Sequence, residues 1–575
     1  MRKSLLQKAP LPLAAWRAFF AGLPRGSVVS IFCLFLVFFS ACGRKGKEPI
    51  RISKAQLLVS DLKPAYGDTL VEGSIGEATN LIPLLTSDAA SQEIAGLIYN
   101  GLVKYDKNVN VVGDLAESWE IGHAGLQITF KLRRGVKWQD GHPFTARDVL
   151  FGFQTITNPK TPTAYAEDFR QVKTAEVLDD YTFRVTYDKP FAPALTSWGN
   201  LVVLPKHLLE GKDITKSELG RNPVGMGPYR FREWISRDRV LLDANPDYFE
   251  GRPYIDRYVV RVIPDLATMF LELKSGGLDL MDLTPTQYRR QTNAPFFQEN
   301  FHKYLYPANA YTYLGYNLLD PKFKDKRVRQ AISYAIDKEE IIKVVLLGLG
   351  VPATGPYKPG LWSYNPNVKK YPYDPAKAMA LLKQAGWEDR NGDGVLEKDG
   401  KPFEFTVITN EGNPLRQRTA VIIQERLKKI GIRMKIRVIE WSAFINEFID
   451  KKDFEATILG WTTGFDPDQY DIWHSSKTGP KELNFISYKN PAVDDLLEQG
   501  RRTFDQEQRK AYYFRLQEIL AEDQPYTFLY VPEALPIVSS RFRGIEPSPL
   551  GISYNLYQWY VPKALQRYGR AAVAP

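Results

Sequence analysis

The residues that most often act as nucleophiles, general bases or metal ligands are few in this chain. Both cysteines, Cys33 and Cys42, lie near the amino terminus, so the body of the chain has no thiol nucleophile. The sequence contains no HExxH, GxSxG or Walker phosphate-loop motif and no intact GxGxxG. The five histidines are far apart and show none of the short spacings of a metal site, although distant residues could still converge on one. We therefore expect no catalysis, no cofactor and no resident metal. The histidines are His123, His142, His207, His302 and His474.

The segment from Asp389 to Gly400 has the oxygen spacing of a calcium loop. Asp389, Asn391 and Asp393 stand at positions 1, 3 and 5, and Gly394 at position 6. Position 12, however, is Gly400, where calcium loops need a bidentate glutamate. We favour a polar hairpin here, with calcium binding as the alternative.

A strand, a turn and a helix follow one another between Ile128 and Pro159. Apolar and polar residues alternate from Ile128 to Leu132, the period that buries one face of a strand. Thr145 is then expected to cap a helix, with Asp148 three residues later holding its first turn. Further on, the pattern predicts helices from Asp374 to Ala385 and from Leu415 to Ile430, and strands from Glu404 to Thr409 and from Arg433 to Ile439.

The string LRRGVKWQDGHPFTARDVLFGF in this segment resembles the signature of the extracytoplasmic solute-binding proteins of family 5, the peptide and nickel receptors of ABC importers. Three further stretches resemble landmarks of the same family, and the resemblance runs from about Gly76 to Pro562. They are NPVGMGPY from Asn222, YLGYN from Tyr313 and VRQAISYAIDK from Val328. A transport receptor is therefore favoured over the alternative, an extracytoplasmic hydrolase.

The resemblance implies an α/β periplasmic-binding-protein type II fold, with two large mixed-sheet lobes, a smaller extra lobe and a ligand cleft between the large lobes. We expect the crossing segments near Tyr306 to Tyr316 and near Tyr526 to Val538. The expected parts are a main lobe (67–100, 191–310 and 526–567), a small lobe (101–190) and a second large lobe (311–525).

The ligand-binding residues follow from the same resemblance. Trp441 and Trp461 match tryptophans that flank the ligand in peptide-binding relatives, and buried core tryptophan is the alternative for both. The loop after the first strand of the main lobe should also face the cleft, or else merely cap the next helix. The remaining candidates are Thr86, Ser87, Asp88, Ala89, Thr462, Thr463, Gly464, Asp466 and Asp468.

Gly464 departs from the family pattern. Dipeptide and oligopeptide receptors have an aspartate at this position that pairs with the ligand's α-ammonium, and a buried ammonium without a carboxylate is costly. Either Asp466, Asp468 or Asp88 takes over that charge, or the ligand has no free amino terminus there. We expect a peptide, held partly through its main chain. A non-peptide solute such as a nickel chelate or an oligosaccharide is the alternative.

The first 41 residues read as an export signal, because five basic residues and no acid precede or flank an apolar run of about 12 residues. Phe39-Ser40-Ala41-Cys42 resembles a lipobox, which predicts a lipid anchor on Cys42 and a tether over 42–66; an uncleaved anchor or a misplaced start is the alternative. Removing the signal lowers the formal net charge from +10 to +5, too mild for a nucleic-acid partner. We expect an extracytoplasmic, lipid-anchored monomer that delivers its ligand to ABC permease subunits.

Overall fold

The computed structural model describes residues 62–569. The first of its two large sheets has β1 at the centre. Strand β1 runs parallel to both of its neighbours, β10 and β11, and every other pairing in the sheet is antiparallel. The sheet is therefore mixed. In spatial order its strands are β12 (Phe301–Lys303), β22 (Pro536–Ser539), β11 (Leu280–Asp282), β1 (Thr69–Ser74), β10 (Arg257–Val262), β9 (Arg239–Ala244) and β8 (Tyr229–Ile235).

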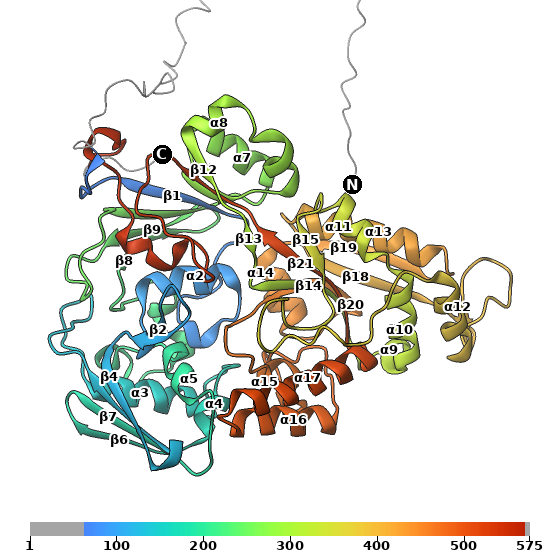
Figure 1. Cartoon of the computed structure of the whole chain (residues 1–575), viewed down its shortest axis with the longest axis horizontal. Helices are drawn as coiled ribbons and strands as arrows, with labels where there is room; N and C mark the ends of the chain where they lie inside the picture. The colour runs from blue at the N-terminus through green and yellow to red at the C-terminus, as the bar shows by residue number, and fades with distance from the viewer. Residues whose placement is uncertain (1–61, 570–575) are drawn as a thin grey trace, which may run out of the picture. The chain divides into compact units, whose positions relative to one another are not determined.

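Helices cover both faces of this sheet, because β1 presents apolar side chains to each side in turn. Leu70 packs with Ile94 of α2 (Ala89–Ile98), whereas Val71 packs with Phe270 of α7 (Leu266–Ser275). Leu70 and Val71 are both fully buried. This layered unit is called the main lobe below (Figure 1).

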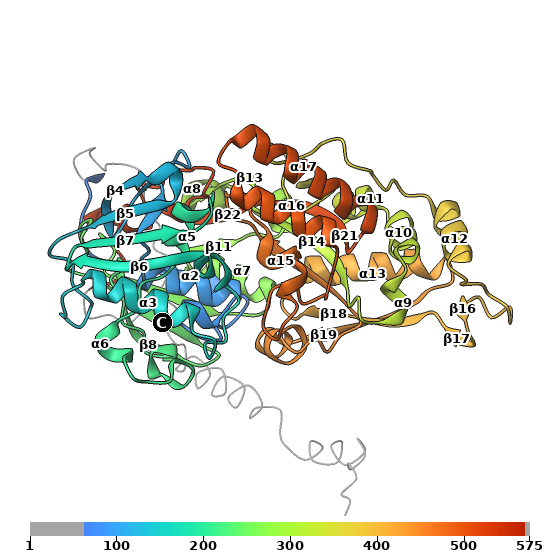
Figure 2. The same ribbon diagram turned by 90° about the horizontal axis from the view of Figure 1, so that it is seen from below.

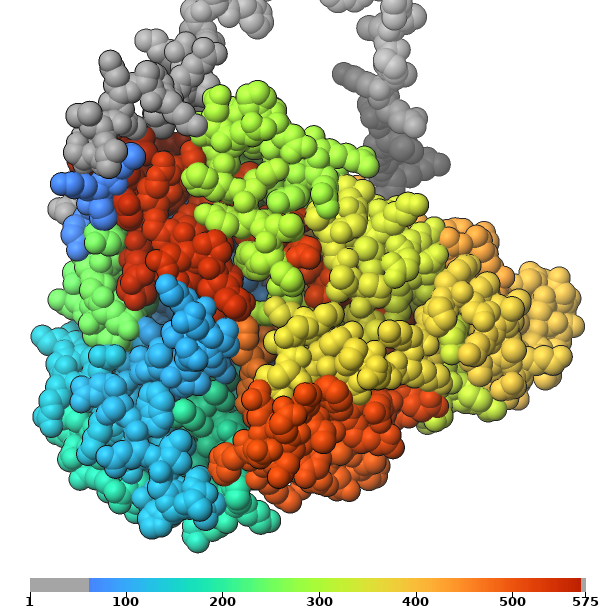
Figure 3. All heavy atoms as spheres, in the orientation of Figure 1, coloured from blue at the N-terminus to red at the C-terminus, as the bar shows by residue number. Residues whose placement is uncertain are grey.

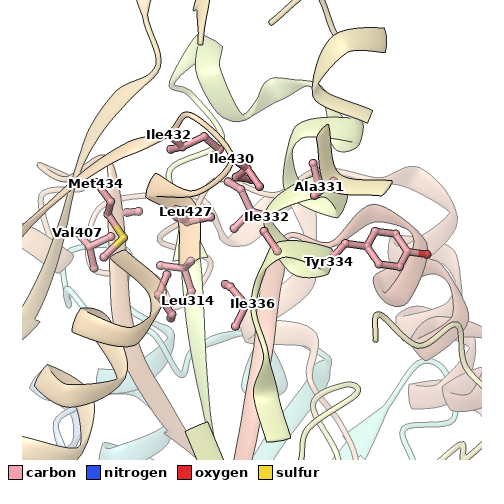
Figure 4. Close-up of a cluster of buried hydrophobic side chains, with 14 of the residues drawn as sticks. Leu314, Ala331, Ile332, Tyr334, Ile336, Val407, Leu427, Ile430, Ile432 and Met434 are labelled. Carbon is pink, nitrogen blue, oxygen red and sulfur yellow. The ribbon is translucent and has the colours of Figure 1, made fainter. Parts of the chain in front are cut away.

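A second mixed sheet lies at the centre of the second lobe. Leu314 of β14 packs on one face with helices α10 (Lys326–Ala335) and α13 (Pro414–Lys428), and Figure 4 shows part of this cluster. Tyr313 packs on the other face with α16 (Pro491–Arg502) and α17 (Gln506–Asp523). The strands in order are β13 (Tyr306–Pro307), β21 (Tyr526–Ala534), β14 (Ala310–Tyr316), β20 (Ala456–Thr462), β18 (Glu404–Asn410) and β19 (Arg433–Ile439), with β15 (Gly350–Pro352) also paired to β21.

The chain passes between the two sheets twice. It leaves the main sheet between β12 and β13 and returns between β21 and β22. We expected the strand from Tyr526 to belong to the main lobe, but β21 pairs with β14 in the second sheet, so the return follows Ala534. The first six residues of β21 are all buried, which suits a strand that is covered on both faces and paired on both sides.

The small lobe is a four-stranded antiparallel sheet with a helix on one face. Its order is β4 (Ala116–Gly122), β5 (Gln127–Leu132), β7 (Thr182–Tyr187) and β6 (Val172–Asp179), and α3 (Ala146–Thr157) packs against it (Figure 2). The predicted cap of α3 is confirmed: the Asp148 carboxylate accepts the Thr145 backbone N–H at 2.9 Å, and the Thr145 side chain caps the first turn.

Other predicted elements of the second lobe are confirmed within a residue or two. The helix predicted from Asp374 is α12 (Pro375–Gln384), and the helix predicted from Leu415 is α13. The strands predicted from Glu404 and Arg433 are β18 and β19, which pair in parallel. Among residues 62–569, no helix combines the length and the apolar character needed to cross a bilayer. The predicted signal, 1–41, and Cys42 lie outside the described residues.

Candidate ligand-binding site

The residues Thr86 to Asp88 connect the 3-10 segment η3 (Pro83–Leu85) to α2, whose first residue is Ala89. Asp88 is the N-cap of α2, and its carboxylate accepts hydrogen bonds from the Ser91 backbone N–H at 2.9 Å and from the Thr86 and Thr79 hydroxyls at 2.5 and 2.6 Å. Capping of the next helix, the alternative interpretation of this loop, is thus observed for Asp88. Asp88 and Thr86 are buried, whereas Ser87 and Ala89 are exposed. Only these last two side chains are free to meet a ligand directly.

This loop faces the second lobe. Thr86 and Ser87 line a small recess together with Asn446 and Asp450 from the second lobe. Burial raises the pKa of Asp450, and the charge of Asp88 acts in the same direction. The predicted candidates at the start of α2 therefore lie where the main and second lobes approach each other.

Trp441 belongs to the second lobe and reaches across to the main lobe. It begins the short helix α14 (Trp441–Ala443), and Glu440 caps that helix by accepting the Ser442 backbone N–H at 3.0 Å. A Cβ atom built on Gly76, in the loop after β1, would lie 3.0 Å from Trp441 Cδ1, so the indole packs against main-lobe backbone where only glycine leaves room. The indole N–H is buried without a hydrogen-bond partner among the described residues.

Trp461 lies near the end of β20, opposite Tyr311 of β14. Its indole N–H donates to the Tyr526 hydroxyl at 3.3 Å, and its ring centroid lies 5.8 Å from that of Phe485. These contacts fix one edge of the ring, while the side chain as a whole is only half-buried. A half-buried indole held at one edge offers an apolar surface on which a ligand can rest.

The residues after Trp461 leave open space. Thr462 and Gly464 are exposed, and the Thr463 backbone N–H donates to the Asn309 carbonyl at 2.8 Å. A Cβ atom at Gly464 would have no neighbour closer than the Asp466 carbonyl oxygen at 4.0 Å. Position 464 therefore has room for an anchoring carboxylate, but glycine does not supply one.

Asp466 and Asp468, the two nearest acids, are already paired with arginines. Asp466 accepts both terminal guanidinium nitrogens of Arg509, the shortest contact being 3.0 Å. Asp468 accepts Nε and Nη2 of Arg501 at 2.8 and 2.6 Å. Both arginines are largely buried, so these charge-assisted pairs would have to be broken before either carboxylate could hold a ligand amine.

Arg501 also ties the second lobe to the small lobe. Its Nη2 donates to Asp168 of α4 (Glu167–Arg170) at 2.6 Å, and its backbone carbonyl accepts the Ala192 N–H at 2.6 Å. Next to it, Lys477 Nζ lies 3.3 Å from Glu167 of the same helix. Figure 3 shows the orange-red surface of the second lobe meeting the teal surface of the small lobe. These ion pairs form a connection that can exist only while the lobes are together.

Three further acids were missed in reading the sequence. Glu72 of β1, Glu93 of α2 and Asp282 of β11 act on one another: burial raises the pKa of Glu72 to about 7 and that of Glu93 to about 8, and the charge of Asp282 adds to both shifts. The side chains of Glu93 and Asp282 nevertheless keep contact with solvent. The available signal was Glu72, an acid on the face of β1 that Leu70 marks as buried.

The histidines and the calcium-like loop form no metal site in the described part of the chain. Across residues 62–569, no group of three or more His, Cys, Asp or Glu side chains could hold a metal ion. In the Asp389 loop the carboxylate is used locally, since it accepts the backbone N–H groups of Gly392 and Gly394 at 2.8 and 3.0 Å. The loop leads into the hairpin β16–β17 (Glu397–Lys398 and Lys401–Pro402), as expected for a polar turn.

Comparison with known proteins identifies the family. The sequence profile of the bacterial extracellular solute-binding proteins, family 5, matches residues 110–482. The chain is also 37% identical over 547 residues to the oligopeptide-binding protein AppA of Bacillus subtilis, covering 93% of this chain and 98% of that protein. The chain belongs to family 5.

Solved structures of family 5 proteins agree with this assignment. AppA of Bacillus subtilis in complex with a nonapeptide superposes with a TM-score of 0.84 and covers 87% of this chain and all of that one. DppA of Helicobacter pylori in complex with the peptide STSA is 32% identical, and NikZ of Campylobacter jejuni in complex with Ni(L-His) is 31% identical. Both have a TM-score of 0.78, covering 87% and 86% of this chain and 99% of theirs. The expected α/β fold with a ligand cleft is thereby confirmed.

Proposed function

We propose that this family 5 protein is the substrate-binding receptor of an ABC importer, which captures peptides outside the cytoplasmic membrane and delivers them to the permease. The observation that carries the proposal is its similarity along nearly the whole chain to an oligopeptide-binding protein whose structure holds a nonapeptide. The arrangement at β20 supports it, because a half-buried tryptophan followed by exposed backbone suits an extended ligand.

Main-chain hydrogen bonds and ring contacts, and not a dedicated carboxylate, hold the ligand in this proposal. Asp466 and Asp468 are engaged by arginines, and Asp88 accepts hydrogen bonds from its own helix and loop. The contact surface consists of Trp441, Trp461 and the exposed segment around Gly464, with Ser87 and Ala89 opposite. Such a surface would accept peptides of varied sequence, since main-chain contacts do not distinguish side chains.

Native mass spectrometry of the purified protein tests the ligand class. After denaturation, sequencing of the released material should yield a set of peptides with unaltered termini. Calorimetry should then give similar affinities for each peptide and its N-acetylated form, because the carboxylates of Asp466, Asp468 and Asp88 are already engaged. A large loss on acetylation would contradict main-chain recognition. A single non-peptide mass would contradict the peptide assignment.

A non-peptide ligand is the second candidate, because one structural neighbour, NikZ, is in complex with Ni(L-His). Titration with nickel and histidine, followed by calorimetry, tests this directly. Catalysis is tested in the same preparation: cleavage of a peptide pool would identify a hydrolase, whereas unaltered retained peptides support a receptor.

Attachment to the membrane through Cys42 belongs to the same proposal. It rests on the lipobox-like Phe39-Ser40-Ala41-Cys42 alone. Labelling with radioactive palmitate should mark the wild-type protein and leave Cys42→Ala unlabelled and released from membranes. Light scattering of the unlipidated chain from Gly43 should give the mass of a monomer.

A further inference from the structure

A cavity of about 430 Å³ lies at the carboxyl end of α2, outside the site described above. Around it are α2, the hairpin formed by β2 (Val103–Tyr105) and β3 (Val111–Gly113), helix α5 (Ala194–Asn200) and the 3-10 segment η10 (Ser553–Gln558). The cavity is thus built from the main lobe, its carboxy-terminal segment and the chain that leads into the small lobe.

Two oxygen atoms on the wall of this cavity lack hydrogen-bond donors. The Asn100 side-chain nitrogen donates to Asp114 Oδ2 at 2.9 Å, which joins the carboxamide and the carboxylate. Among residues 62–569, Asn100 Oδ1 has no hydrogen-bond partner, and Asp114 Oδ1 has only a long ion pair with Lys104 Nζ at 3.6 Å. The two residues are only 8% and 4% exposed. Leaving buried acceptors unpaired costs free energy, so a bound group that donates hydrogen bonds to Asn100 Oδ1 and Asp114 Oδ1 would be stabilised.

The charges around this pair favour a cation. Lys104 Nζ is engaged by Glu250 Oε2 at 2.5 Å and lies 3.6 Å from Asp114 Oδ1, and Arg133 Nε donates to the Asp114 backbone carbonyl at 2.6 Å. Glu250 and Asp114 share the single charge of Lys104, so Lys104 does not fully compensate the Asp114 side-chain carboxylate. The carboxyl end of α2 adds the negative end of the helix dipole.

The cavity adjoins the proposed ligand site through Tyr105. Tyr105 lines the cavity, and its ring centroid lies 5.7 Å from that of Phe465, between Trp461 and Asp468. A side chain of a ligand resting at Trp461 would therefore find the cavity beside it, across the Tyr105 ring.

We propose that this cavity is a side-chain subsite that receives a lysine or arginine side chain of the bound peptide, with Asn100 Oδ1 and Asp114 Oδ1 as its hydrogen-bond acceptors. The inference rests on the proposed peptide-binding function and adds a preference for cationic ligands to it. A lysine ammonium or an arginine guanidinium supplies the donors that both oxygens lack, and its charge complements that of Asp114.

Calorimetry with a defined series of pentapeptides tests the subsite. The probes are pentaalanine peptides with one lysine at each successive position, and matched peptides with norleucine, which has a similar length but no charge. We expect lysine to bind about tenfold more tightly than norleucine at one position. If none of the pentapeptides binds, the peptide proposal itself fails at this length. If they bind without any lysine preference, only the subsite is refuted.

Asp114→Asn should bring the ratio of lysine to norleucine affinities close to one. The matched control is Asp188→Asn, an exposed aspartate paired with Lys173 in the small lobe, which should keep the full preference. A preference that survives in Asp114→Asn would overturn the assignment and indicate that water satisfies the two oxygens.

Gly96→Leu provides a variant that does not depend on the charge. Gly96 lies inside α2 and lines the cavity, and a Cβ atom added there would have no atom within 4 Å. Leucine should therefore fold well, since it favours the helix more than glycine does, and its side chain should fill the cavity. We expect the lysine preference to fall at least fivefold in Gly96→Leu and to persist in Gly96→Ala. Equal lysine preference in both variants would refute the subsite.

Discussion

Replacing Asp168 with asparagine should weaken ligand capture although this residue lies outside the proposed ligand site. The Asp168–Arg501 contact of 2.6 Å joins the small lobe to the second lobe, and the Arg501 side chain is only 6% exposed. A buried hydrogen bond to a charged group contributes about 1.5 to 3 kcal/mol. Asparagine keeps a neutral acceptor, and Arg501 keeps its two bonds to Asp468, so we expect a loss of about 1 kcal/mol, roughly fivefold in affinity.

Combining Glu167→Gln with Asp168→Asn should double the loss of binding free energy. Lys477, whose side chain is 3% exposed, loses its charged partner on α4 but keeps Asp471 at 3.6 Å and Glu482 at 3.8 Å. The double variant should therefore lose about 2 kcal/mol, roughly 30-fold in affinity. The reason is that these bonds form only when the lobes meet, so removing them favours the open form.

Calorimetry with a captured peptide measures the affinity, and small-angle scattering with and without that peptide measures the closing of the lobes. The control is Asp180→Asn, whose partner Arg147 lies within the small lobe at 3.4 Å and whose side chain is 58% exposed; it should behave as wild type. If the double variant binds and compacts like the wild-type protein, the ion pairs do not contribute to closure and the reasoning is wrong.

Three further outcomes are expected. Trp461→Ala should weaken peptide binding by at least about 1 kcal/mol, measured by calorimetry, while Trp119→Ala in the small lobe should not; equal affinities would remove Trp461 from the site. Glu93→Gln should flatten the fall in melting temperature between pH 5 and 8. The folded pKa of Glu93, about 8, exceeds its ordinary value of 4.5, so the folded state binds the extra proton and loses stability as pH rises through this window. An unchanged pH profile would contradict that assignment. Arg541→Met should destabilise the fold by about 3 to 5 kcal/mol in urea unfolding, because it leaves Asp68 buried without its cation and Asp279 with only the distant Arg567 at 3.9 Å. If Arg541→Met lowers the free energy of unfolding by less than Arg147→Met, which breaks an exposed ion pair, then the Arg541 ion pairs do not stabilise the fold as argued.

Much of the fold could be predicted because its signals are local. The cap formed by Thr145 and Asp148 depends on residues three apart, and α12, α13, β18 and β19 were read from periodicity alone. The family resemblance supplied the arrangement of lobes. The sheet to which β21 belongs was predicted wrongly, since its pairing with β14 joins residues about 200 positions apart, which periodicity does not report.

The candidate site was less predictable. The sequence indicated that Asp466, Asp468 and Asp88 lie near the ligand, but it could not tell which carboxylates are free. Arg509 and Arg501 reach the first two from 43 and 33 residues away, and α2 engages the third. Each acid has the same intrinsic pKa and charge wherever it stands, so its availability depends on neighbours that only folding supplies.

The sequence by itself determined the family, the elements and the absence of an anchoring carboxylate at Gly464, because each of these is written in consecutive residues. Only the tertiary structure decided that the neighbouring acids are paired, that Glu72 and Asp282 lie close enough to Glu93 to raise its pKa, and that Asn100 Oδ1 and Asp114 Oδ1 have no hydrogen-bond donor within the described residues. The physical reason is that hydrogen bonding and desolvation act over a few ångströms in space, and those distances are set by the packing of strands and helices that lie far apart along the chain.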